Sequence, residues 1–264
     1  AHPKKSVRLF YTQHFDTSRW KKDYPNDIKN LKWLMKHYSV QPIALNKAMK
    51  ASMDRILQTD RTRILNNGVD MSEFQKPLDR NAKRNALNVP QDAFAIAHVG
   101  RFDPIKNHEF LVKVFQQVKK KKPEAFLLMV GRGETEEKVR NQLEGAGLAD
   151  SYRILHDRTD VAEILQACDA AVFPSFSEGL GIAVIEIQAA GLCCVASTGV
   201  PKDACISNRI RFLSLEESAE VWTDTLLKMV ASKNPIQYDG LEEWDIRQNV
   251  GQLEKMYEEA MRLR

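Results

Sequence analysis

Short apolar runs alternate with longer segments of helical periodicity along most of the chain from residue 93 onward. The runs that are apolar enough for buried strands are Phe94–Val99, Ala125–Val130, Tyr152–Leu155, Ala170–Phe173 and Cys193–Ala196. The segments with helical periodicity cover residues 107–118, 135–147, 161–167 and 182–190. Strands that alternate with helices at this spacing are typical of βαβ units and a parallel sheet. We therefore predict an α/β fold with helices on both faces of the sheet and ligands at the carboxyl ends of its strands.

The two ends of the chain are less regular. The elements predicted there are strands at Val7–Thr12, Val40–Leu45 and Ile210–Leu213, and helices over residues 46–56, 216–230 and 244–264. Asn67-Gly68 is a turn signal between the N-terminal elements and the regular part. The predicted division is a partial N-terminal α/β domain over residues 1–65, the main α/β domain over residues 66–240 and a C-terminal helix over residues 241–264.

Composition excludes some classes of protein. The net charge is only +4 and no aromatic-rich basic face is evident, which argues against nucleic-acid binding. No apolar run approaches the roughly 20 residues that span a bilayer, and the first ten residues contain no signal-peptide core. Cys168, Cys193, Cys194 and Cys205 lack zinc-type spacing. We expect buried free thiols in a protein of the reducing cytosol.

The basic cluster Lys119–Lys122 has two interpretations. Cations at the end of a helix interact favourably with its dipole, which would make the cluster a solvated helix end. The alternative is contact with an anionic membrane surface, which would place the protein peripherally on the inner face of the membrane. The first interpretation is preferred because it requires no partner.

Two glutamates stand in the stretch Pro174–Gly191, which we interpret as the end of a strand, a loop and a buried helix. Glu178 lies in the loop, and Glu186 lies about two turns down the helix among aliphatic residues. A carboxylate at such a position is destabilising unless something pairs with it. A helix that begins behind a glycine-containing loop offers unpaired N–H groups to an anion. The stretch therefore predicts a phosphate near Gly179–Gly181 and hydroxyl groups near the two carboxylates.

A second candidate motif follows the strand Phe94–Val99. Gly100-Arg101 and Lys106 lie in the loop between this strand and the next helix, which Asn107 is expected to cap. Two cations beside a helix N-terminus are suited to a diphosphate. The competing interpretation is a pair of solvated surface cations. The sequence Gly131-Arg132-Gly133 after the next strand is either a tight turn or a further part of the site, and we weigh these equally.

The spacing of Glu178 and Glu186 reproduces the E-x7-E motif of the retaining glycosyltransferases of family four, and PSFSEGLGIAVIEIQAAG resembles that family's donor-site loop and helix. The resemblance is greatest to enzymes of capsule and exopolysaccharide biosynthesis. It implies the GT-B fold, in which residues 66–240 form the Rossmann-like donor domain. The segment Asn66–Asp70 is similar to the family's passage between its two domains, and only residues 1–65 precede it. We therefore expect the first part of the family's N-terminal domain to be absent from this sequence.

The resemblance also implies roles for individual residues. The candidate catalytic residues are Glu178, Arg101, Lys106 and His14. The candidate donor-binding residues are Gly100, Arg101, Lys106, Arg153, His156, Glu178, Gly179, Leu180, Gly181 and Glu186. In the family, the Arg and Lys hold the nucleotide diphosphate, the first Glu contacts the donor sugar and the second Glu accepts hydrogen bonds from the ribose diol.

Two of these assignments are less direct. The segment Arg153–Asp160 corresponds to the part of the family that lies near the base, but His156 stands where a glycine is usual. His14 follows the first predicted strand, where the family has a His that faces the acceptor or the donor sugar. A surface or capping role for His14 is an equal alternative.

The predicted function is retaining transfer of a sugar from a nucleotide diphosphate sugar, expected to be a UDP-sugar, to a glycan or lipid-linked acceptor. We expect a cytoplasmic protein with no cofactor and no essential metal, since no Asp-x-Asp motif is apparent. Retention is usually written as front-face attack in this family, and double displacement is the other route. Two alternatives remain: a nucleotide-sugar-binding module that transfers only with a partner chain, and a GT-B sugar-nucleotide epimerase.

Overall fold

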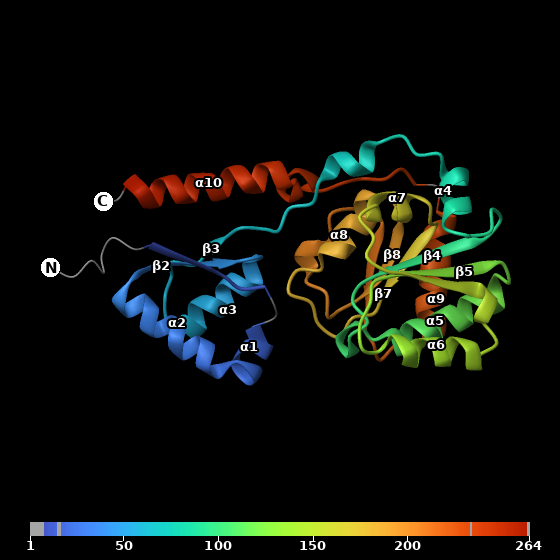
Figure 1. Ribbon diagram of the computed structural model, residues 1–264, viewed down its shortest axis with the longest axis horizontal. Helices are drawn as coiled ribbons and strands as arrows, with labels where there is room; N and C mark the ends of the chain where they lie inside the picture. The colour runs from blue at the N-terminus through green and yellow to red at the C-terminus, as the bar shows by residue number, and fades with distance from the viewer. Residues whose placement is uncertain (1–7, 15–16, 233, 263–264) are drawn as a thin grey trace. The chain divides into compact units, whose positions relative to one another are not determined.

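The computed structural model of the protein describes residues 8–14, 17–232 and 234–262 (Figure 1). Contacts within the chain divide it into two compact units. The first unit contains the described residues up to Asp70, the segment Glu178–Leu180 and the chain from Gly240 onward, and the second contains Met71–Ser177 and Gly181–Asp239. The domain boundaries at residues 65/66 and 240/241 remain predictions.

The second unit is built on a six-stranded parallel sheet in the order β6-β5-β4-β7-β8-β9. Its strands are β4 (Phe94–Val99), β5 (Ala125–Val130), β6 (Tyr152–Leu155), β7 (Ala170–Phe173), β8 (Cys193–Ser197) and β9 (Ile210–Leu213). The order reverses between β4 and β7, because β5 and β6 extend to one side and β8 and β9 to the other. Open α/β sheets bind ligands beyond the carboxyl ends of their strands at such a switch point. The predicted α/β fold is confirmed.

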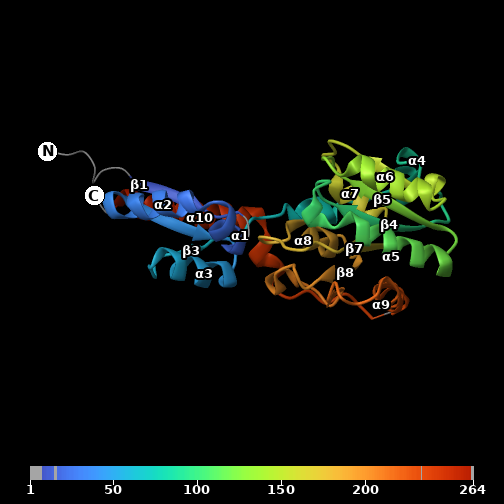
Figure 2. The same ribbon diagram turned by 90° about the horizontal axis from the view of Figure 1, so that it is seen from below.

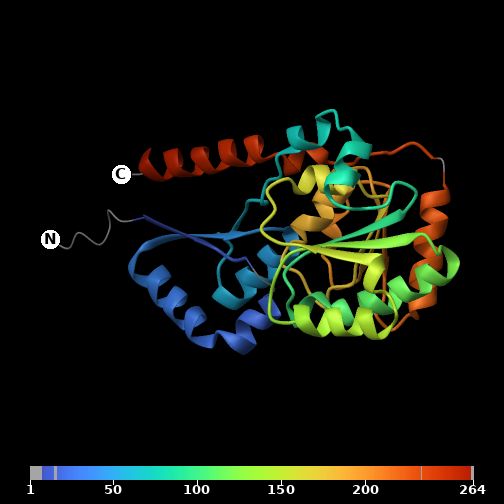
Figure 3. The ribbon, with the colours of Figure 1, turned by 45° about the vertical axis from the view of Figure 1, so that its right-hand side comes forward.

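Helices cover both faces of this sheet. They are α4 (Arg80–Ala86), α5 (His108–Lys121), α6 (Glu136–Gly145), α7 (Val161–Gln166), α8 (Ile182–Ala189) and α9 (Ala219–Ala231). Helices α5, α6 and α9 lie on one face, and α7 and α8 lie on the other (Figures 1 and 3). Because helices shield both faces, the strands are apolar throughout rather than alternating, and every residue of β5 and β7 is buried.

The main core of the second unit lies between the sheet and the layer of α5, α6 and α9. Ile96 of β4 and Leu127 of β5 pack there with Val114 and Phe115 of α5 and with Trp222 of α9. Each of these side chains is at most 1% exposed. The rigid sheet that results fixes the starting points of the loops at its carboxyl edge.

The first unit has a smaller parallel sheet in the order β1-β2-β3. Its elements are β1 (Arg8–Thr12), α1 (Thr17–Asp23), α2 (Pro25–His37), β2 (Ser39–Ala44), α3 (Lys47–Leu57), β3 (Arg63–Ile64) and α10 (Ile246–Arg262), which Figure 2 shows from below. The Asn67-Gly68 turn packs against the start of α10, where a Cβ on Gly68 would lie 2.3 Å from Cα of Ile246. The Val69 N–H donates to the carbonyl oxygen of Trp244 at 2.7 Å.

The cysteines match the expectation only in part. Cys168, Cys193 and Cys194 are buried free thiols, whereas Cys205 is exposed because it follows a short 3₁₀ turn at the surface. Among the helices in the described ranges, none is long and apolar enough to cross a bilayer.

The basic cluster at the end of α5 is engaged within its own unit. Lys119 Nζ donates to the carbonyl oxygen of Ala125 at 3.2 Å, and Lys121 pairs with Asp224 and Glu220 of α9. These contacts favour the interpretation of Lys119–Lys122 as a helix end.

Candidate functional site

The loops that follow β4 and β5 are locked together by backbone contacts. Gly131 has φ +148°, and a Cβ there would lie only 2.0 Å from the carbonyl oxygen of Gly100. Gly133 has φ +155°, and a Cβ there would lie 2.4 Å from the carbonyl oxygen of Phe102. Phe102 N–H in turn donates to the carbonyl oxygen of Arg132 at 3.0 Å. Both glycines are therefore needed for tight backbone packing, which holds the Gly100 loop at the carboxyl edge of the sheet.

Lys106 is anchored within the β4–α5 loop. It ends a short 3₁₀ helix, Pro104–Lys106, in which Asp103 Oδ1 accepts a hydrogen bond from Ile105 N–H at 2.9 Å. Its Nζ lies 4.9 Å from the ring centroid of Phe173, the last residue of β7. Its stem lies over Gly100, where a Cβ would be 3.2 Å from Lys106 Cε. The ammonium group is thereby held at the switch point between β4 and β7.

Arg101 differs from Lys106 in its surroundings. Its side chain is 80% exposed, and its guanidinium lies 3.9 Å from the carboxylate of Asp103. The two cations therefore stand on one loop, one held against the sheet edge and the other reaching into solvent. Asn107 does not cap α5 with its side chain, contrary to the prediction, because it adopts a left-handed conformation (φ +53°) and closes the 3₁₀ turn.

Two buried histidines lie beneath this loop. His98 of β4 and His108 of α5 have ring centroids 4.7 Å apart, and His108 stacks on Phe102 at 4.4 Å. Burial, together with the nearby charge of Lys106, lowers the pKa of His108 to about 4, and burial is also the main cause that lowers the pKa of His98. Both rings are therefore neutral at physiological pH. This pair was not predicted from the sequence, although a His in the otherwise apolar strand Phe94–Val99 was a signal for it.

Glu186 is a half-buried carboxylate without a protein partner. It makes no hydrogen bond or ion pair with another residue in the described ranges, so the alternative of a core Glu paired with a Lys or Arg is not supported. Burial raises its pKa from 4.5 to about 7. The nearby Gln188 shows the contrast, because it donates to Ala204 O at 2.7 Å and accepts from Ile206 N–H at 3.1 Å. The fold therefore provides hydrogen-bond partners for the amide of Gln188. It provides none for the carboxylate of Glu186 from the described residues, so this group can accept hydrogen bonds from a ligand.

The loop Glu178–Gly181 leads into α8. Gly181 adopts φ +80°, and a Cβ there would lie 2.9 Å from Cγ1 of Val200, so the position favours glycine. Within the described part of the chain, the N–H groups of Gly179, Leu180 and Gly181 donate no hydrogen bond. Glu178 is half-buried and belongs with Gly179 and Leu180 to the first unit by its contacts. These N–H groups are available to an anion or to hydroxyl groups.

The residues predicted to lie near the base occupy the edge of the sheet. Arg153 is exposed on β6. His156, just beyond β6, has its Nε2 2.8 Å from Oε2 of Glu136, the first residue of α6. A base contact by His156 would compete with this pair, and the assignment stays a prediction.

His14 is exposed just beyond β1 of the first unit. Its predicted contact with acceptor or donor sugar also stays a prediction. The structure brings Gly100, Lys106 and Phe173 together at one sheet edge, and it leaves Glu186 unpaired on α8.

Comparisons with known proteins identify relatives of the chain. The chain is 31% identical over 215 residues to the putative glycosyltransferase EpsF of Bacillus subtilis, which covers 76% of this chain and 54% of the relative. It is 29% identical over 138 residues to an Escherichia coli UDP-Gal:alpha-D-GlcNAc-diphosphoundecaprenol alpha-1,3-galactosyltransferase, covering 51% of this chain and 36% of that protein. The chain thus spans about half or less of the length of these curated relatives.

Solved structures show the same fold. Anabaena Alr3699/HepE in complex with UDP-glucose matches with a TM-score of 0.79 at 18% identity, over 96% of this chain and 72% of that one. Sucrose-phosphate synthase from Thermosynechococcus elongatus matches with a TM-score of 0.77 at 19% identity, over 97% of this chain and 68% of that one. Both matches confirm a GT-B fold. The profile of the family described as glycosyl transferases group 1 matches residues 79–240, more than half of the sequence, and the chain therefore belongs to that family.

Proposed function

We propose that this chain binds a UDP-sugar and provides the donor site of a retaining glycosyltransferase. The acceptor is a glycan or a lipid-linked saccharide in the biosynthesis of a capsule or exopolysaccharide. The observation that carries the proposal is Glu186, a half-buried carboxylate that no other described residue pairs with. Its helix follows the loop Glu178–Gly181, in which the N–H groups of Gly179, Leu180 and Gly181 donate no hydrogen bond within the described part of the chain.

Glu186 has the properties of a ribose-binding group. A vicinal diol donates two hydrogen bonds, and an ionised carboxylate accepts both with its two oxygens. Such bonds favour the charged form, which opposes the effect of burial on the pKa of Glu186. The binding of a ribose therefore relieves an unfavourable feature of the free protein, and this couples nucleotide binding to the ionisation of Glu186.

Arg101 and Lys106 supply the positive charge that a diphosphate requires. Negative charge grows on the leaving diphosphate as the bond to the sugar breaks, and two cations at this position stabilise it. Lys106 is held in place by Phe173 and by the Gly100 backbone, so little reorganisation is needed when the ligand binds. We expect the reaction to proceed without an essential metal ion.

Glu178 and the N–H groups of Gly179–Gly181 form the sugar-binding part of the proposed site. N–H groups ahead of a helix favour anions and sugar hydroxyls that accept hydrogen bonds. The Glu178 carboxylate accepts from sugar hydroxyls that donate. Together these groups can orient the hydroxyls of a pyranose.

We propose front-face transfer as the mechanism. The bond between the anomeric carbon and the β-phosphate oxygen breaks, and the acceptor oxygen bonds to the same face of that carbon. The acceptor proton moves to the leaving diphosphate oxygen, so no protein base is needed and the configuration is retained. This route suits a site in which the cations Arg101 and Lys106 stabilise the leaving group.

The names of related proteins support the choice of substrate. The Escherichia coli relative is named for UDP-Gal and a diphosphoundecaprenol acceptor, and Anabaena HepE is described in complex with UDP-glucose. A lipid-linked acceptor of this kind is found at a membrane, so we propose a cytoplasmic protein that reaches the inner membrane surface peripherally. Sedimentation with anionic vesicles, compared with neutral vesicles, tests this location.

Calorimetric titration of the chain with UDP, GDP and ADP tests the donor site. Each titration is made first with a chelator and then with Mg²⁺. We expect UDP to bind most tightly and with the same affinity in both conditions. Absence of binding by all three nucleotides would contradict the proposal. Tighter binding of GDP or ADP would mean that the site prefers a base other than uracil.

Activity assays separate the proposed transferase from its alternatives. The chain is incubated with UDP-glucose, UDP-galactose and UDP-N-acetylglucosamine, with and without acceptor extracts, and proton NMR follows the anomeric signals. A transferred sugar with an unchanged anomeric configuration supports retaining transfer. Conversion of one UDP-sugar into another without acceptor would indicate an epimerase, and UDP binding without any turnover would indicate a binding module.

A further inference from the structure

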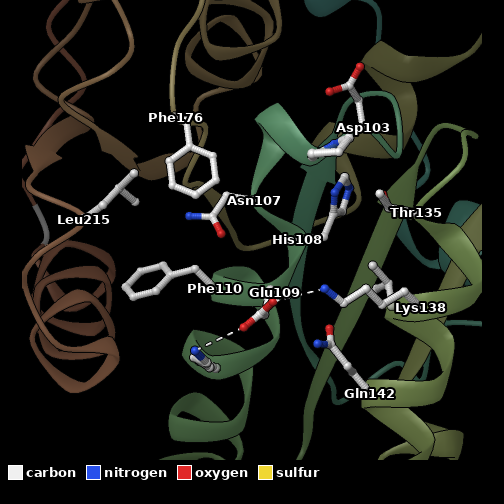
Figure 4. Close-up of a pocket in the computed structure, with 13 residues that line it drawn as sticks. Asp103, Asn107, His108, Glu109, Phe110, Thr135, Lys138, Gln142, Phe176 and Leu215 are labelled. Carbon is white, nitrogen blue, oxygen red and sulfur yellow. Dashed lines mark hydrogen bonds and ion pairs between the residues drawn. The ribbon is translucent and has the colours of Figure 1, made fainter.

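A cavity of about 460 Å³ lies in the second unit between the N-terminal halves of α5 and α6 (Figure 4). This volume is within the range of about 300–1,000 Å³ that is usual for small-molecule sites. Neither Arg101, Lys106 nor Glu186 lines it. The cavity lies on the face of the sheet covered by α5 and α6, whereas Glu186 belongs to α8 on the other face (Figure 1). It is therefore separate from the proposed nucleotide site.

Three side chains that line this cavity have buried polar atoms without a hydrogen-bond partner in the described residues. They are both ring nitrogens of His108, Oγ1 of Thr135 and Oε1 of Gln142. His108 is only 3% exposed. Buried polar atoms are as a rule hydrogen-bonded, because leaving each one unpaired is destabilising by about 1–3 kcal/mol. These four atoms belong to side chains that line one cavity but are themselves closed to solvent, so a polar molecule completes their hydrogen bonds once the side chains rotate toward it.

The charges around the cavity balance. Asp103 and Glu109 contribute carboxylates, and Lys113 and Lys138 contribute ammonium groups. Glu109 holds both lysines, at 3.4 Å and 3.3 Å, as the dashed lines in Figure 4 show. The buried ring of His108 is neutral at physiological pH. The cavity therefore has no net charge with which to recruit an ion, and its occupant is a neutral molecule.

The wall opposite His108 is apolar. Phe176 and Leu215 lie on the other side of the cavity from Thr135 and Gln142, with Phe110 beside them (Figure 4). Phe176 is 57% exposed, so its ring face is available to a ligand. A pyranose ring combines C–H faces that pack on aromatic rings with hydroxyl groups that both donate and accept hydrogen bonds. Such hydroxyls can satisfy an imidazole, a hydroxyl and an amide oxygen together.

We propose that this cavity binds a neutral saccharide, in the form of one hexopyranose unit. The pyranose hydroxyls pair with His108, Thr135 and Gln142, and its C–H face packs on Phe176. The site is a second sugar site, and it stands on observations independent of the proposed donor site. Asp103 and Asn107 border it and belong to the segment that follows Arg101, so its occupant contacts the rear of the proposed diphosphate loop.

Protein-observed NMR with methyl pyranosides tests the proposal. Methyl glucoside, galactoside and N-acetylglucosaminide are titrated at millimolar concentrations into the chain saturated with UDP, and methyl glucuronide serves as the charged comparison. At least one neutral glycoside should shift the amide signals of His108 and Gln142. The proposal is overturned if no neutral glycoside does so, if shifts are confined to Gly179–Gly181, or if the glucuronide binds more tightly.

Substitutions test whether glycoside binding depends on the residues that line the cavity. Gln142→Leu removes a hydrogen-bonding group from the cavity and Phe176→Ala removes its aromatic wall, and each should weaken glycoside binding about tenfold. Gln117→Leu makes the same change on α5 outside the cavity and should leave the affinity unchanged. UDP titration of each variant verifies that the fold is intact. Equal glycoside affinity in Gln142→Leu, Phe176→Ala and the unaltered chain would overturn the proposal, because the glycoside would then bind outside the cavity.

Discussion

Glu186→Gln is expected to change stability and ligand binding in opposite directions. In the free protein, burial raises the pKa of Glu186 from 4.5 to about 7. A carboxyl group whose pKa is raised by folding favours the folded state when it is protonated. The stability of the unaltered protein should therefore fall as pH rises from about 4.5 through about 7. The neutral amide of Gln has no such penalty, so the variant should be the more stable protein at pH 8.

The pKa values set the size of this effect. At about 1.4 kcal/mol per pKa unit, the change from 4.5 to about 7 corresponds to at most about 3.5 kcal/mol above pH 7. Because the Glu186 side chain keeps some contact with solvent, we expect about 1–2 kcal/mol. Urea unfolding of both proteins at pH 5 and pH 8 measures it. The difference between their free energies of unfolding should be small at pH 5 and clearly larger at pH 8.

Binding should respond in the opposite sense. An ionised carboxylate that accepts from the ribose diol contributes about 1.5–3 kcal/mol, so Glu186→Gln should weaken UDP binding by about 10- to 100-fold. The analogue 2′,3′-dideoxy-UDP lacks both hydroxyls, and its affinity should be nearly the same for the two proteins. Gln188→Glu is unsuitable as a control because Gln188 is hydrogen-bonded on both sides. Glu254→Gln, which changes an exposed carboxylate on α10, provides the matched control and should change neither quantity.

Two outcomes would refute this reasoning. If Glu186→Gln destabilises the protein at pH 8, the carboxylate has a partner and is a structural group. If UDP and the dideoxy analogue lose affinity equally, Glu186 does not contact the ribose.

Other predictions concern the loops around the site. Removal of either cation, by Arg101→Ala or Lys106→Met, should weaken UDP binding at least about tenfold and leave uridine binding unchanged. Calorimetry that shows equal losses for UDP and uridine would contradict the diphosphate assignment. UDP affinity should be constant above about pH 7 and fall as pH drops below it, because protonation of Glu186 opposes binding. A UDP affinity that does not change between pH 8 and pH 5.5 would argue against this coupling. Gly131→Ala should destabilise the protein by about 1–3 kcal/mol from backbone strain alone. Gly145 has open space around it, so Gly145→Ala should stabilise the protein by about 0.5–1 kcal/mol. Thermal unfolding that shows Gly131→Ala to be at least as stable as Gly145→Ala would contradict the loop packing.

The strands and most helices of the second unit follow from local pattern. Phe94–Val99 and Ala125–Val130 were predicted with the bounds that the structure shows, because a strand buried on both faces is apolar throughout. The start of α9 was predicted three residues early, at residue 216. The helix begins at Ala219 because Ser218 Oγ accepts a hydrogen bond from Val221 N–H, and this cap was not recognised.

Other features depend on contacts between segments far apart in sequence, which a local pattern cannot show. Gly131-Arg132-Gly133 allowed two interpretations until the close approach of the Gly100 carbonyl oxygen showed that backbone packing requires Gly131. The cluster of His98, His108 and Phe102 brings together side chains from β4, from α5 and from the loop between them. The residues of the second sugar site likewise come from several elements. The prediction that Asn107 caps α5 was wrong, because the preceding 3₁₀ turn, stabilised by Asp103, sets the backbone conformation of Asn107.

Carbon-13 NMR of the Glu186 carboxyl group tests the central claim most directly. The signal is assigned by comparison with Glu186→Gln and titrated from pH 4 to pH 9 with and without saturating UDP. We predict a pKa near 7 in the free protein and a clearly lower pKa in the complex, because the ribose hydroxyls stabilise the ionised form. A Glu186 titration curve that saturating UDP leaves unchanged would contradict the proposed site.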